Sequence, residues 1–244
     1  MEGEFISLCG KGKLDEAKAL YRFFENVDVS YNNEQAFRLT CYYGHLEVAK
    51  WLLQVKPDIN ISAQNEGAFH WSCCHGHLKV AKWLLSVKPD INISIHNDEE
   101  FRFACENGHL DIAKWLLSVK PDINISLLNE YAFCHTCKNG HLEVAKWLLS
   151  VKPDINISID NEYTFRWVCY NGYLEVAKWL QSLKPYLYVI IYDINGNYTG
   201  YKIRTKEEAN MEKRKIALHL ALQDTTNILY HLPVDIAKAV TLFV

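Results

Sequence analysis

The strongest constraint on this sequence is a repeat with a period of 32 residues. A glycine followed by an aromatic ring marks it, at Gly44-His45, Gly76-His77, Gly108-His109, Gly140-His141 and Gly172-Tyr173. A tryptophan keeps the same step, at Trp51, Trp83, Trp115, Trp147 and Trp179. A fixed period of this length is typical of stacked arrays, in which each unit buries one face on its neighbours. The pattern therefore favours a binding role over catalysis.

Each unit predicts a short first helix. In one copy, Asn65 followed by Glu66 favours a helix start, because asparagine caps helix N-termini and a negative charge suits the helix dipole there. Phe69 and Cys73 then lie at positions i and i+4 on one face. Gly76 predicts the end of the helix, since glycine tolerates a left-handed backbone.

A second helix is expected directly after this glycine. Leu78, Ala81 and Leu85 form one apolar stripe, with Leu84 beside it, and Pro89 stops the helix. The next stretch, residues 90–94, alternates polar and β-branched side chains and predicts an extended finger or a hairpin arm. The expected second helices start near Leu14, Leu46, Leu78, Leu110, Leu142 and Leu174.

This unit of helix, turn, helix and finger resembles the ankyrin repeat. Gly76-His77-Leu78 matches the opening of that family's second helix, and residues 88–92, KPDIN, are similar to its Gly-Ala-Asp-Val-Asn. Residues 67–70 depart from its Thr-Pro-Leu-His, and the unit is one residue shorter than usual. The resemblance covers about residues 1–185 and implies an all-α, ankyrin-type α-solenoid of about six repeats with finger loops. The segment AKWLLSVKPDINIS is also similar to ankyrin proteins of giant amoeba-infecting viruses, which implies a protein partner in the host. Reduced thiols suit a cytosolic or nuclear location, and with the viral resemblance we expect an intracellular protein of the host cytoplasm.

After residue 185 the period is lost. Residues 186–192 and 198–203 flank Asn195-Gly196 and predict a β-hairpin, a helix is expected over 206–222, and an apolar helix over 234–243. Residues 186–244 are therefore predicted to form a C-terminal capping segment for the array of residues 1–185. In the alternative, Leu232-Pro233 resembles the start of the F-box-like motif of poxviral ankyrin proteins. That resemblance implies an adaptor that recruits a cullin-type ubiquitin ligase subunit.

The residues that could carry chemistry follow the repeat. Since six of the eight cysteines share one slot, we expect them to be packed thiols (Cys9, Cys41, Cys73, Cys105, Cys137 and Cys169). Cys134 and Cys137 could form half of a zinc site, but a second ligand pair is missing from the sequence. The histidines after the glycines are periodic, so we expect hydrogen bonds to backbone between units. We accordingly predict no enzyme activity, no cofactor and no metal.

Composition narrows the choice of partner. The net charge of -3 provides no basic field for nucleic acid. No apolar run approaches the length of a membrane span, and the first residues do not read as a secretory signal. A protein partner is therefore expected.

Equivalent positions of successive repeats that hold different residues are free to contact that partner, although such positions could also simply vary on a solvated surface. They fall at the finger tips and on the exposed part of each first helix. Tyrosine is a frequent interface anchor, which gives the tyrosines the most weight. The predicted partner-binding residues are Gln35, Tyr42, Tyr43, Gln64, His75, His96, Glu99, Glu106, Leu128, Tyr131, Lys138, Asp160, Tyr163 and Tyr170.

Overall fold

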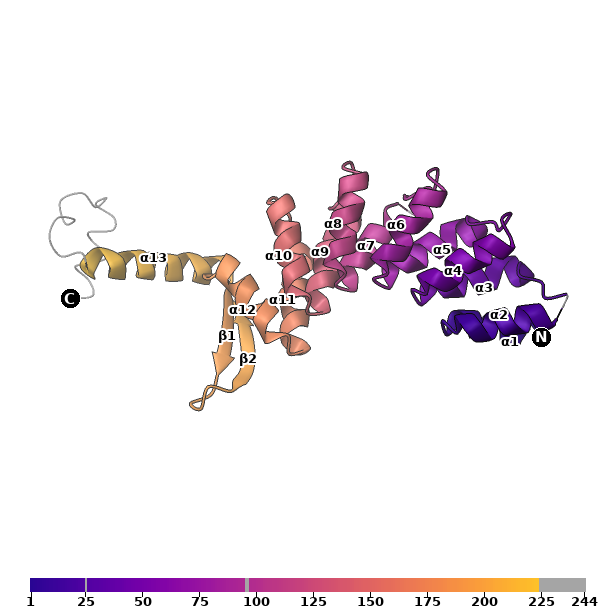
Figure 1. Ribbon diagram of the computed structural model, residues 1–244. Helices are drawn as coiled ribbons and strands as arrows, with labels where there is room; N and C mark the ends of the chain where they lie inside the picture. Colours follow the sequence, from indigo (N-terminus) through magenta and orange to yellow (C-terminus); the bar gives the residue numbers. More distant parts are fainter. Residues whose placement is uncertain (25, 95–96, 224–244) are drawn as a thin grey trace. The chain divides into compact units, whose positions relative to one another are not determined.

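The computed structural model describes residues 1–24, 26–94 and 97–223 (Figure 1). These residues form two compact units, Met1–Thr164 and the part from Phe165 on. The first helices of the repeats are α1 (Glu2–Gly10), α3 (Tyr31–Tyr42), α5 (Ala63–Cys74), α7 (Glu99–Glu106), α9 (Leu127–Lys138) and α11 (Ile159–Tyr170). The second helices are α2 (Leu14–Phe23), α4 (Leu46–Val55), α6 (Leu78–Val87), α8 (Leu110–Val119), α10 (Leu142–Val151) and α12 (Leu174–Leu183). Two strands, β1 (Tyr188–Tyr192) and β2 (Tyr198–Ile203), precede α13 (Lys206–Gln223).

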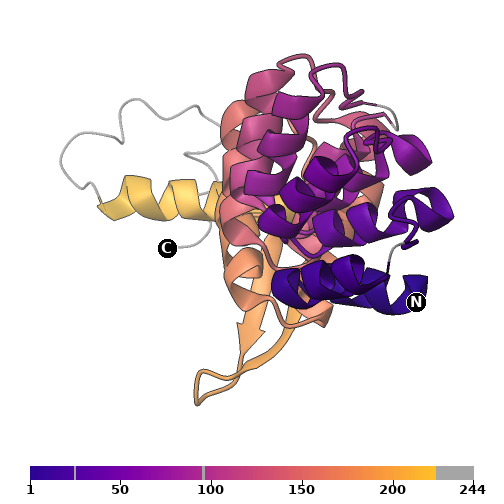
Figure 2. The same cartoon turned by 45° about the vertical axis from the view of Figure 1, so that its right-hand side comes forward.

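Within the first unit, each first helix packs on the first helix of the next repeat and on its own second helix, from α1 to α10. Figure 2 shows these hairpins of helices lying side by side. All six second helices begin at the leucines expected from the repeat, which confirms that part of the prediction. The core of this unit includes one position of the repeat that is always phenylalanine and one that is always alanine, all with exposed fractions near zero: Phe5, Phe37, Phe69, Phe101, Phe133, Ala17, Ala49, Ala81, Ala113 and Ala145.

The periodic tryptophans join neighbouring repeats. The ring of Trp83 lies 6.2 Å from that of Phe37, which belongs to the preceding repeat. Phe69 and Trp115 repeat this contact at the same centroid distance. Trp51 and Trp147 make the same contact, with Phe5 and Phe101, so these four tryptophans are packing residues.

The apolar stripe of the second helix differs from the prediction. In α6 the buried side chains are Val80, Ala81 and Leu84, whereas Leu78 and Leu85 are only half-buried. The helix packs on its own first helix, α5, and its Trp83 packs on the preceding repeat, and its most buried face is centred on Ala81 and Leu84.

The predicted helix start at Asn65 is wrong. Gln64, Asn65 and Glu66 have φ values of 56°, 54° and 57°, a left-handed conformation that interrupts α5. Non-glycine residues adopt it at a cost of about 1 kcal/mol or more each, so other contacts must hold it. The Glu66 carboxylate is buried and accepts a hydrogen bond of 2.7 Å from the hydroxyl of Ser62.

The equivalent carboxylate in other repeats also reaches the next finger. Glu34 accepts a bond of 2.9 Å from the hydroxyl of Ser30 and one of 3.3 Å from the backbone N–H of Asn60. Glu130 makes the same pair of bonds, to Ser126 and to the N–H of Asn156. The acidic residue that looked like a partner for the helix dipole is therefore a buried joint between successive fingers.

The fingers are loops built from turns. In one of them the Asn60 side chain accepts a bond from the N–H of Ser62, and Ile59 is buried. Of the two expectations for this segment, the loop is confirmed, and no strand is assigned to the described part of the fingers.

The second unit contains the predicted hairpin. Strands β1 and β2 pair antiparallel around a turn in which Gly196 has φ of 82°. The Asp193 carboxylate accepts bonds from the N–H groups of Asn195 and Asn197, which closes the turn. The ring of Tyr188 on β1 stacks on Phe165 at 4.0 Å, and this pair anchors the hairpin. The expected helix over 206–222 is confirmed by α13, whereas the one over 234–243 lies outside the described residues.

Candidate protein-binding surface

Four aromatic side chains gather on the exposed side of α3 and α5. We call Tyr42, Tyr43, Trp71 and His75 the aromatic patch. The ring of Tyr42 lies 4.1 Å from His75, 5.6 Å from Trp71 and 4.7 Å from Tyr43. Tyr43 and Trp71 remain 53% and 40% exposed. The patch thus presents rigid rings with polar edges to solvent, a composition typical of interface anchors.

Trp71 was missed by the sequence analysis, although a signal for it existed. Its slot, read every 32 residues, holds Leu39, Trp71, Phe103, His135 and Trp167. This slot changes between copies as much as those that were chosen. The same criterion, applied to the whole first helix, would have found it.

A second cluster joins α7 to α9. The Tyr131 hydroxyl donates a bond of 2.8 Å to one oxygen of Glu106, and His135 Nδ1 lies 3.1 Å from the other oxygen. The rings of Tyr131 and His135 stack at 3.9 Å, and the Arg102 guanidinium lies 5.1 Å from the Tyr131 ring. Burial, together with the bond to Glu106, raises the pKa of Tyr131 to about 12. These contacts hold the side chains in one arrangement before any partner binds.

Beside this cluster lies a pocket of about 150 Å³, between α9 and the first turn of α11. The ammonium of Lys138 lies 4.4 Å from the centroid of the Tyr163 ring. The structure thus brings together four of the predicted partner-binding residues around one cavity, which are Leu128, Tyr131, Lys138 and Tyr163.

The other predicted residues are placed apart from these clusters. Gln35 is half-buried and accepts a bond from Asn32 beside the finger, and Gln64 is exposed in the left-handed turn. Glu99 is half-buried on α7, where its charge adds to the rise in the pKa of Tyr131. Tyr170 is 82% exposed on the second unit. His96 lies outside the described residues, as does the side chain of Asp160.

Histidines of the repeat connect neighbouring repeats, as expected. His77 Nε2 lies 2.9 Å from the backbone carbonyl of Tyr42, and His109 and His141 likewise bond the backbone of Cys74 and Glu106. Burial lowers the pKa of all three imidazoles. They are structural bridges held in the neutral form.

The eight cysteines are all free and buried, which confirms their packing role. Burial raises the pKa of the Cys9 thiol to about 12 and that of Cys169 to about 11, and it also raises the pKa of Cys41, Cys73, Cys74, Cys105 and Cys137. Within the described residues, no three potential ligands come close enough to hold a metal ion.

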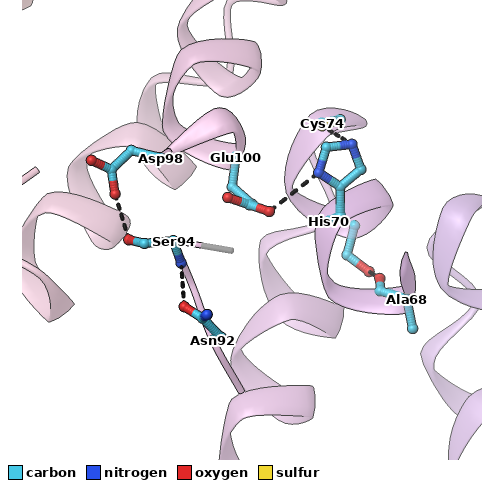
Figure 3. Close-up of polar contacts among 8 residues, drawn as sticks. Ala68, His70, Cys74, Asn92, Ser94, Asp98 and Glu100 are labelled. Atoms are coloured by element: carbon cyan, nitrogen blue, oxygen red, sulfur yellow. Dashed lines mark hydrogen bonds and ion pairs between the residues drawn. The ribbon is translucent and has the colours of Figure 1, made fainter. Parts of the chain in front are cut away.

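One thiol, Cys74, has neighbours that resemble catalytic machinery (Figure 3). Its sulfur lies 3.6 Å from His70 Nε2, and His70 Nδ1 lies 3.2 Å from a buried oxygen of Glu100. Thiol, imidazole and carboxylate in this order can activate a nucleophile. However, Cys74 is 4% exposed, and burial followed by the charge of Glu100 raises its pKa. A protonated, covered thiol is a poor nucleophile, so the arrangement serves as a polar link between α5 and α7.

Comparisons with known proteins agree with this architecture. The family model described as ankyrin repeats (3 copies) matches residues 6–95 and 101–195. The chain therefore belongs to the ankyrin-repeat family, whose members generally mediate protein–protein interaction. The crystal structure of the human ASB11 ankyrin repeat domain is similar to it with a TM-score of 0.56 and 16% identity, covering 85% of this chain and 96% of that one. No curated protein matches the sequence. None of the described helices has the length and apolarity needed to cross a membrane.

Proposed function

We propose that this chain is a non-enzymatic scaffold that binds a protein partner through the exposed face of its first helices. The aromatic patch is the observation that carries the proposal. Its rings contact one another and stay partly exposed, so a partner can bury them without first ordering them. The helices that carry the patch, α3 and α5, each pack between two other first helices, which keeps this surface rigid.

The choice of binding over catalysis follows from the buried groups. The one arrangement of thiol, imidazole and carboxylate found among the described residues has a covered, protonated sulfur. His77, His109 and His141 bond the backbone of the preceding repeat. An intracellular location is part of the proposal, and the eight free thiols support it because reducing compartments preserve them.

The aromatic patch can be tested by partner capture. Changing Tyr43 and Trp71 together to serine removes two exposed rings, and the expected result is loss of a partner that the unchanged chain retains from extracts of its own cells. The matched control changes Lys50 and Glu47, an exposed ion pair on α4, to alanine. Equal capture by the patch variant and the control would rule out the patch as the binding surface.

Two finer proposals rest on sequence resemblance alone. The partner is a protein of an infected host, as the similarity to viral ankyrin proteins suggests, and the segment around Leu232-Pro233 recruits a ubiquitin ligase subunit. That segment lies outside the described residues. A chain ending at residue 223 should then keep its target and lose the ligase subunit. Retention of a ligase subunit by the shortened chain would refute the adaptor role.

A further inference from the structure

The pocket beside α9 contains a buried hydroxyl without a partner. Thr164 is 1% exposed and lines the pocket, and its Oγ1 has no hydrogen-bond partner in the structure. Buried polar groups are nearly always paired, so an orphan of this kind needs an explanation. The corresponding slot holds Ala36, Ala68 and Ala132 in three other repeats and Glu100 in a fourth, so packing alone does not require a hydroxyl there.

The pocket also contains an unneutralised positive charge. The ammonium of Lys138 lies over the Tyr163 ring and makes no ion pair with the described residues. The carboxylate of Glu106 on the neighbouring helix is already occupied by Tyr131 and His135. The charge of Lys138 is thus available to a group that enters from outside.

The walls around these two donors are mostly apolar. Leu128, Ile159 and the ring of Tyr131 line the cavity. Its volume of about 150 Å³ suits one side chain rather than a large ligand. A ligand with short methylene groups and a terminal acceptor of negative charge would satisfy the walls, the ammonium and the hydroxyl together.

We propose that this pocket receives one acidic side chain, a glutamate or an aspartate, from the partner protein. The carboxylate accepts the hydrogen bond of Thr164 and pairs with Lys138, while the methylene groups lie on Leu128 and Tyr131. This inference rests on the proposed binding function and adds to it the chemistry of one contact. It concerns a site separate from the aromatic patch.

The test titrates the full chain with N-acetylglutamate amide and follows the backbone amide signals of Lys138, Tyr163 and Thr164 by NMR. N-acetylglutamine amide is the neutral probe of the same shape. The expected result is that the glutamate probe shifts these signals in a saturable way and the glutamine probe does not. Equal shifts with both probes would overturn the proposal, because charge would then have no part in binding.

Two variants assign the donors. Lys138→Gln should weaken the glutamate probe roughly tenfold, since a charge-assisted bond is lost. Thr164→Val keeps the shape of the side chain, so it should weaken the probe while leaving thermal stability unchanged or raised. An unchanged response in Lys138→Gln contradicts the proposal. An unchanged response in Thr164→Val, in a folded protein, contradicts the role of the hydroxyl.

Two further measurements distinguish a failure of the pocket proposal from a failure of the proposed binding function. N-acetylalanine supplies a free α-carboxylate in place of a side-chain carboxylate. If this probe binds more tightly than the glutamate probe, the pocket receives the C-terminus of a chain, and the assignment to an acidic side chain is overturned. Partner capture that depends on Tyr43 and Trp71 but survives Lys138→Gln would remove the pocket proposal and keep the proposed function. Capture that is lost on Lys138→Gln and restored by Lys138→Arg supports both.

Discussion

The imidazole Nε2–H of His77 donates a hydrogen bond of 2.9 Å to the backbone carbonyl of Tyr42, in the preceding repeat. The carbonyl belongs to a residue of the aromatic patch. This bond therefore holds the backbone that carries the aromatic patch, and loss of the His77 imidazole should lower stability and weaken the proposed partner binding together.

Acidification should destabilise the protein at the histidines that join neighbouring repeats. Burial lowers the pKa of His77 below its usual value of 6.5, and the pKa of His109 and His141 falls for the same reason. The unfolded chain then binds protons more readily than the folded one. The free energy of unfolding should therefore keep its full value above about pH 6.5 and decrease as the pH falls below 6.5. Urea denaturation at pH 7.5 and pH 5 measures this. His109→Gln should flatten the dependence, whereas stability that rises on acidification would contradict the account.

The turn glycines should be intolerant of a side chain. A Cβ at Gly76, where φ is 83°, would lie 2.7 Å from the ring of His109, so Gly76→Ala combines backbone strain with a clash. We expect a loss of about 2 kcal/mol or more in the free energy of unfolding. Gly172 is the matched control, because its φ is 75° and no atom lies within 4 Å of its added Cβ. Gly172→Ala should lose only about 1 kcal/mol, and an equal loss at both sites would exclude the clash.

The cluster around Glu106 should be visible in the titration of one tyrosine. The pKa of Tyr131 is raised to about 12, so its hydroxyl should stay protonated while exposed tyrosines ionise. Tyrosine-selective ¹³C labelling, with Tyr131→Phe to assign the signal, follows this ionisation directly. The same variant should lose about 1–2 kcal/mol of stability, because a bond to a charged acceptor disappears. Ionisation of Tyr131 together with the exposed tyrosines would show that the bond to Glu106 does not form.

The thiols should be unreactive in the folded protein. All eight cysteines are buried, and burial raises the pKa of the thiols of the repeated slot, such as Cys9 and Cys169, so a disulfide reagent should modify the cysteines slowly under native conditions and quickly in denaturant. Cys74 is the informative case because of its contact with His70. Selective alkylation of Cys74 ahead of Cys41 in the folded chain would revive the catalytic interpretation.

Much of the fold could be predicted from the residues that end helices and form turns. Glycine and proline set the ends of the helices, and the Asn195-Gly196 turn was placed correctly between β1 and β2. The helix start at Asn65 was misplaced because capping rules consider only nearby residues. The left-handed turn there depends on a buried carboxylate, and its analogue at Glu34 uses a donor 26 residues away.

The candidate site followed only in part. Variation between copies identified Leu128, Tyr131, Lys138 and Tyr163, and the structure gathers these four around one pocket. It did not identify Thr164, whose significance depends on the lack of a partner in three dimensions. The assignment of these residues to partner binding stays a prediction, as does the division of the chain at residues 185 and 186.

The carboxylate joint between fingers has a consequence for how such a chain can change in length. The bonds from Asn60 to Glu34 and from Asn156 to Glu130 span the same 26 residues, so any internal copy supplies what its neighbours require. Gaining or losing whole modules of 32 residues regenerates every joint, whereas an insertion of another size strands a buried negative charge. Duplication and loss within the gene can therefore change the exposed side chains of the array while its helical framework stays intact.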